Sequence, residues 1–140
     1  ELAALLHDYA GIKDRRLREE HHLHGQVEAE RILAGLGYPQ ERIRAIQHCI
    51  ATHRGSVRGE WHSVEAECLA NADAMTHLQQ IPSLLHLAFV ERHMSVDEGV
   101  LWLRAKLGRS WAKLSPAVQE MMRPTYDAAL TMLTVLPGKG

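Results

Sequence analysis

The sequence has few of the residues that mark several common classes of protein. It contains only two cysteines, Cys49 and Cys68, and neither belongs to a CxxC pair, which excludes a disulfide framework or a cysteine zinc knuckle. The formal net charge is -1, so no basic field is available for a nucleic-acid polymer or an anionic membrane. No apolar run approaches the length of a membrane span, and no signal peptide is recognisable. These absences predict a reducing, cytoplasmic setting.

Histidine, by contrast, is abundant, with ten residues among 140. Imidazole binds metals and exchanges protons near neutral pH, so this composition points to metal or proton chemistry. A chain of this length is large enough to bury a real core as one domain. The sequence is rich in leucine, alanine and charged residues along most of its length, and it contains few runs of β-branched residues. We therefore expect an all-α fold, a single helical domain over residues 1–140.

Apolar periodicity and capping residues predict where the helices begin and end. Gly37 suits the end of one helix, and Pro39 suits the first turn of the next. Ser95 and Glu98 have the spacing of a capping box, and Pro124 is a candidate break in the last helix. Helices are expected at about residues 22–36, 63–78, 84–93 and 95–114, and two more are expected to begin at residues 39 and 115. Loops are expected at residues 11–20 and 54–59, and a loose tail at residues 137–140.

His7 and Asp8 follow directly after the apolar run Leu2–Leu6. On a helix, this run has no polar surface before the His-Asp pair, as is typical of a buried helix. An ionised aspartate is costly to bury unless it is paired or bound to a metal. Alternatively, the helix ends here, and both side chains turn to solvent at Gly11.

Helical phase places other polar residues toward the interior. His53 lies seven residues after Ile46, on the apolar stripe of its helix. His22 lies seven residues before Ala29 and is expected to face the core. Asp73 shares a sector with small apolar residues, where a carboxylate needs a cation or strong donors. Four helices are thus expected to direct imidazole or carboxylate groups inward.

Mixed imidazole and carboxylate ligands suit Mn, Fe, Co, Ni, Zn or, with more waters, Mg. A lone inward histidine is more often a satisfied core residue, but several of them converging with two carboxylates favour a metal site. His77, four residues after Asp73, either joins that metal or orients the aspartate by a hydrogen bond. His24 shares a face with charged residues and is expected to face water.

The candidate residues belong to four sequence blocks, which follow one another in the order Ala4-Leu5-Leu6-His7-Asp8, His21-His22-Leu23-His24-Gly25, Ile50-Ala51-Thr52-His53-Arg54-Gly55 and Ala70-Asn71-Ala72-Asp73-Ala74. These blocks resemble the HD-domain superfamily of metal-dependent phosphohydrolases. Their order and spacing are similar to those of the small stand-alone bacterial and archaeal members.

The resemblance implies an HD-domain-like helical bundle with a metal site between its helices. It assigns metal binding to His7, Asp8 and Asp73, together with an upstream histidine on a preceding helix. The chain begins too late to contain that histidine, so we expect its natural N-terminal helix to be missing. His22 and His53 match two further histidines that hold a second metal or contact substrate phosphate in some members. His24 is the alternative to His22.

We therefore expect a divalent-metal-dependent phosphohydrolase that acts on a small nucleotide or another phosphate ester. The metal would polarise a phosphoryl oxygen and lower the pKa of a bound water, which Asp8 or Asp73 would orient. Lys13, Arg54 and His24 are candidate substrate-binding residues, although lysine and arginine in loops are often plain surface charges.

Two other functions fit the same residues. One is a di-iron oxygenase on the same scaffold, which requires both extra histidines at the metals. The other is a non-catalytic regulatory domain that binds a nucleotide or a metal, suggested by the missing upstream ligand. A partner surface formed by the three tryptophans is a weaker third reading, because tryptophan at helical spacing usually belongs to a core.

Overall fold

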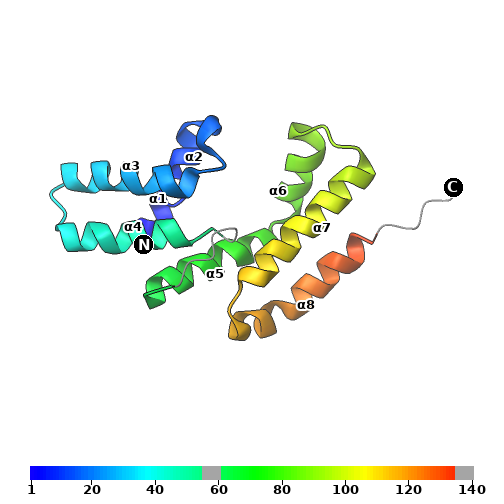
Figure 1. Ribbon diagram of the computed structural model, residues 1–140. Coiled ribbons are helices and arrows are strands. Elements are labelled where there is room, and N and C mark those ends of the chain that lie inside the picture. Colours follow the sequence, from blue (N-terminus) through cyan, green and yellow to red (C-terminus); the bar gives the residue numbers. More distant parts are fainter. Residues whose placement is uncertain (55–60, 135–140) are drawn as a thin grey trace. The chain divides into compact units, whose positions relative to one another are not determined.

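The computed structural model describes residues 1–54 and 61–134 (Figure 1). In these ranges the chain forms helices joined by turns, without any strand, which confirms the predicted all-α class. None of the helices described combines the length and apolar character needed to cross a membrane. The loop predicted after Arg54 and the predicted tail at 137–140 lie outside the described residues.

The chain divides into two compact units, Glu1–Ala70 and Asn71–Gly140. The boundary falls within one helix, α5 (Val64–Gln79). The first turn of α5 is capped as the sequence predicts, because the Ala66 backbone N–H donates to Ser63 Oγ at 3.2 Å. That residues 1–140 form a single domain stays a prediction.

The first unit begins with short helices rather than one continuous helix. α1 ends at Leu6, and α2 begins only at Tyr9, so His7 and Asp8 lie at the junction. Part of the loop expected at residues 11–20 is helical, because α2 extends into it as far as Lys13 and a 3-10 turn lies within it. The elements before α5 are α1 (Leu2–Leu6), α2 (Tyr9–Lys13), η1 (Arg15–Leu17), α3 (His21–Gly35) and α4 (Gln40–Thr52).

α3 and α4 lie side by side and form the main helix pair of this unit (Figure 1). Their packed faces bury Ala29 and Leu33 on α3 together with Ile43 and Ile50 on α4. Gly25 permits close approach, since a Cβ there would lie 3.0 Å from Ile50 Cγ2. The pair therefore brings the start of α3 close to the end of α4.

At the end of α3, two leucines differ in their exposure, although helical phase alone predicts the same for both. Apolar phase places Leu36 inward with Leu33, but Leu36 is 69% exposed whereas Leu33 is 1% exposed. α3 ends at Gly35 and the chain turns at Gly37, whose φ of 74° is left-handed. Leu36 therefore lies past the last turn to which the helical phase applies.

In the second unit, α7 begins with the predicted capping box. The Glu98 backbone N–H donates to Ser95 Oγ, and the Ser95 backbone N–H donates to Glu98 Oε2. α8 continues through Pro124 instead of breaking there. The helix expected at 84–93 is divided between α6 and a π-helical segment. The elements after α5 are α6 (Ile81–His86), η2 (Leu87–Glu91), α7 (Val96–Lys113) and α8 (Pro116–Met132).

Candidate metal centre

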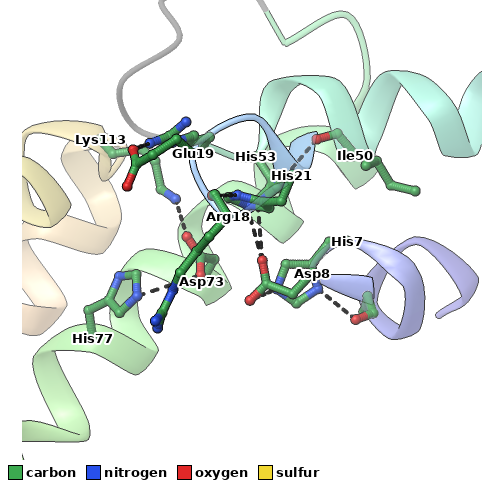
Figure 2. Close-up of polar contacts among 12 residues, drawn as sticks. His7, Asp8, Arg18, Glu19, His21, Ile50, His53, Asp73, His77 and Lys113 are labelled. Carbon is green, nitrogen blue, oxygen red and sulfur yellow. Dashed lines mark hydrogen bonds and ion pairs between the residues drawn. The ribbon is translucent and has the colours of Figure 1, made fainter. Parts of the chain in front are cut away.

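A cluster of one carboxylate and three imidazoles occupies the first unit. Asp8 faces His7, His21 and His53 (Figure 2). His7 and Asp8 come from the junction between α1 and α2, His21 begins α3, and His53 follows the last residue of α4. We call these four residues the His-Asp cluster.

The four side chains approach within coordination or hydrogen-bonding range. Asp8 Oδ1 lies 3.1 Å from His21 Nε2 and 3.8 Å from His53 Nε2. Asp8 Oδ2 lies 3.4 Å from His7 Nε2. The two nitrogens His21 Nε2 and His53 Nε2 are 3.1 Å apart. The Nε2 atoms of all three imidazoles thus lie within 3.8 Å of an oxygen of the Asp8 carboxylate.

The other ring nitrogen of each imidazole is held by the backbone three residues earlier. His7 Nδ1 is 2.7 Å from the Ala4 carbonyl, and His21 Nδ1 is 2.7 Å from the Arg18 carbonyl. His53 Nδ1 is 2.6 Å from the Ile50 carbonyl. Because a carbonyl only accepts, each Nδ1 must donate its hydrogen, and in the neutral ring Nε2 keeps its lone pair. Metal-binding histidines are typically oriented in this way.

The converging lone pairs need a positive charge among them. Neutral His21 and His53 would oppose two Nε2 lone pairs at 3.1 Å, which is stable only with a proton or a cation between them. Two hydrogen bonds hold the pKa of Asp8 far below its usual range, and the one from His21 has a larger effect than the one from His7. The hydrogen bond to Asp8 raises the pKa of His21, against the opposing effect of burial. Protons can supply this charge, and so can a metal ion.

The cluster meets the geometric requirement for a metal site. Ligand atoms of His7, Asp8 and His53 all lie within 4.8 Å of one another. The His53 side chain is 2% exposed and the Asp8 side chain 50%, so the cluster is closed on one side and open on the other. Catalytic metal sites share this feature, because substrate or water needs an open position.

His21 is the residue that phase analysis missed. The sequence indicated His22, which is buried as expected but has no hydrogen-bond partner at Nδ1 among the described residues. Burial lowers the pKa of His22, so its ring favours the neutral form. The contacts with Asp8 and His53 are made by His21. One signal was present: His21, Gly25, Ala29 and Leu33 follow each other at four-residue spacing. Metal binding by His22 stays a prediction.

The three candidate substrate-binding residues are all engaged with carboxylates. Lys13 Nζ donates to Glu28 Oε1 at 2.9 Å. Arg54 Nη2 donates to Glu19 Oε2 at 2.7 Å. His24, whose side chain is 44% exposed, lies 3.7 Å from Glu20 Oε2, in agreement with its expected solvent-facing position. The charges of Lys13 and Arg54 are therefore largely balanced in this structure.

Asp73 lies on α5 in the second unit. Its Oδ2 accepts a hydrogen bond from Lys113 Nζ, and its Oδ1 lies 4.0 Å from His77 Nε2 (Figure 2). The Lys113 side chain is 6% exposed, so this is a largely buried ion pair. The sequence argument that a carboxylate at this position needs a cation is thus met by Lys113. Its predicted metal and catalytic roles stay predictions.

A comparison of the chain with protein-family models, curated proteins and solved structures finds no match.

Proposed function

We propose that the protein is a divalent-metal-dependent phosphohydrolase of the HD-domain type, acting on a small nucleotide or another phosphate ester. The observation that supports this most is the His-Asp cluster, in which three Nε2 atoms and a carboxylate converge while each Nδ1 donates to a backbone carbonyl. The resemblance of the sequence blocks supplies the reaction class. The cluster supplies the means to hold the ion.

His7, Asp8, His21 and His53 would hold the ion, and their nitrogen and oxygen donors suit Mn, Fe, Co, Ni or Zn, or Mg with more waters. When bound, such an ion polarises a phosphoryl oxygen and lowers the pKa of water. The low pKa of Asp8 keeps its carboxylate ionised at any working pH, so it both neutralises the site and accepts a hydrogen bond from water. The Asp8 side chain is 50% exposed, so a small phosphate ester would have access to the bound ion.

The experiment that tests this proposal is a substrate and metal screen of the full chain. Metal-stripped protein is supplied with Mn, Co, Ni, Zn, Fe or Mg and assayed for phosphate release from p-nitrophenyl phosphate and nucleoside phosphates. We expect turnover that requires one of these ions. No turnover with any of them would contradict the proposal, and so would two tightly bound, redox-active irons per chain, which would favour the oxygenase.

One observation favours a second candidate, a non-catalytic domain that binds a metal or a nucleotide. Glu28 and Glu19 pair with Lys13 and Arg54, the cations expected to meet substrate phosphate. A phosphate group would have to displace these carboxylates before it used either cation. Metal binding at the His-Asp cluster without any phosphate release in the screen would support this alternative.

We also expect metal affinity to depend on pH. The hydrogen bond that His21 donates to Asp8 raises the pKa of His21, so below that pKa a metal must displace a proton from His21 Nε2. Affinity for Mn²⁺ should fall by about tenfold per pH unit once the pH drops below the pKa of His21. The folding stability of the metal-free protein should depend on pH in the opposite direction to metal affinity. The stabilisation from protonated His21 is complete below about pH 6.5 and is lost as pH rises through the raised pKa of His21.

The measurement is the shift in melting temperature caused by Mn²⁺ at pH 6 and at pH 8. A larger shift at pH 8 is expected. Equal shifts at both pH values would mean that His21 is not a ligand. His48, which accepts from the His62 backbone N–H, provides the control: the His48→Gln variant should keep the full pH dependence.

A further inference from the structure

An apolar groove lies entirely within the second unit, between α6, η2, α7 and α8. Its volume is about 320 Å³, and every side chain that lines it is apolar. The side chains that line it include Phe89, Val96, Val100, Ala129 and Leu133. A water molecule needs polar partners to settle in a cavity, so a groove of this composition favours an apolar occupant.

One wall of the groove comes from an irregular segment of backbone, which carries the lining residue Phe89. Residues Leu87–Glu91 form a π-helical turn, which is closed when the Arg92 backbone N–H donates to the Leu87 carbonyl at 3.0 Å. His93 then has a left-handed φ of 52°, a conformation that a non-glycine residue keeps only when its surroundings hold it. Such π turns often occur at functional sites.

Phe89, within this turn, is pressed against Gly99 on α7. A Cβ at Gly99 would lie only 2.2 Å from Phe89 Cε1, so the ring occupies space that any other residue would fill. Phe89 is thereby kept against α7 as a wall of the groove. The groove is therefore built by the packing of its walls rather than by a loosely placed side chain.

The cation Arg104 lies next to Leu133, one of the residues that line the groove. Arg104 follows Val96 and Val100 at four-residue spacing on α7, so it continues the ridge that lines the groove. Its Nη1 donates to the Leu130 carbonyl at 3.1 Å and to the Leu133 carbonyl at 3.2 Å, which places the guanidinium beside a lining residue. Among the described residues no hydrogen bond from its Nη2 or Nε is found, and both can donate to a carboxylate.

We propose that this groove binds an unbranched acyl chain of about ten carbons, with its carboxylate at Arg104. The length follows from volume, since an apolar cavity of roughly 150 Å³ holds benzene and this groove is about twice as large. The groove is too small for a protein partner, which needs about 800 Å² on each side. A single guanidinium beside an otherwise apolar wall matches a ligand with one anionic end.

The test is calorimetric titration of the full chain with decanoate below its micellar concentration. One molecule should bind per chain, and Ala129→Leu, which fills the groove, should weaken binding about tenfold or more. The matched control is Ala128→Leu, the same change at the neighbouring exposed position of α8, which should bind as the wild type does. Absence of decanoate binding, or undiminished binding to Ala129→Leu, would overturn the proposal.

The role of Arg104 has its own readout. Decanol, which has the same chain without the charge, should bind the wild type about tenfold more weakly than decanoate. In Arg104→Met the two ligands should bind equally, and this ratio is insensitive to a general loss of stability. Equal affinity of the wild type for decanol and decanoate would overturn the assignment of a carboxylate ligand.

Discussion

Asp8→Asn is expected to weaken Mn²⁺ binding by about 100-fold or more and to abolish any metal-dependent phosphate release. Even the groups that orient metal ligands typically contribute 10–100-fold to affinity, so loss of a charged ligand should cost at least as much. Asparagine keeps the size of the side chain but removes the charge that the three imidazoles surround. Isothermal titration with Mn²⁺ and the phosphate-release assay measure the two effects.

The Asp8→Asn variant should also change the pKa of His21 in the metal-free protein. The raised pKa of His21 is due first to its hydrogen bond with Asp8, so this pKa should fall in Asp8→Asn. Imidazole NMR titration reports it directly. Asp14→Asn is the matched control, because Asp14 contacts Arg16 instead and asparagine also caps the turn at η1. Wild-type metal affinity in Asp8→Asn would remove the His-Asp cluster from consideration as a metal centre.

Leu33→Ala is expected to destabilise the protein by about 2–5 kcal/mol. Leu33 is 1% exposed and packs with Ala29, Ile43 and Ile50 between α3 and α4, so truncation leaves a cavity in that interface. The free energy of unfolding from urea denaturation is the measurement. Metal affinity should decrease as well, because α3 and α4 position His21 and His53 relative to each other.

Leu36→Ala provides the control for the same chemical change on the same segment. Leu36 is 69% exposed, so its truncation should change the unfolding free energy by less than about 0.5 kcal/mol. Similar losses from the two substitutions would contradict the boundary of α3 at Gly35 and would restore the inward position that phase alone predicted for Leu36.

Much of the secondary structure could be predicted because its signals are local. The Ser95 capping box, the Ser63 cap and the start of α8 after Ser115 all lie where the sequence indicates. Two local features were less clear from the sequence. The opening helix ends before His7, which the sequence left open as an alternative, and the helix expected before His93 contains a π turn. Neither position has a proline or a glycine, the residues that usually indicate an interruption of a helix.

The site was predictable in part. His53 is buried as its phase requires, and the structure brings it to His7 and Asp8. Helical phase did not indicate His21, because phase describes the middle of a helix well and its first residue poorly. At the first turn a side chain is free to reach past the helix end, and its contacts depend on what packs there.

By itself, the sequence determined the all-α class, the positions of most helices and the residue types of a candidate metal site. Those properties follow from interactions over three or four residues, which a linear pattern contains. Only the tertiary structure decided that His21 meets His53, which lies 32 positions later in the sequence, and that all three Nε2 atoms turn toward Asp8. That convergence depends on how closely α3 packs on α4 at Gly25 and on where α1 ends, and both are set by packing between segments distant in the sequence.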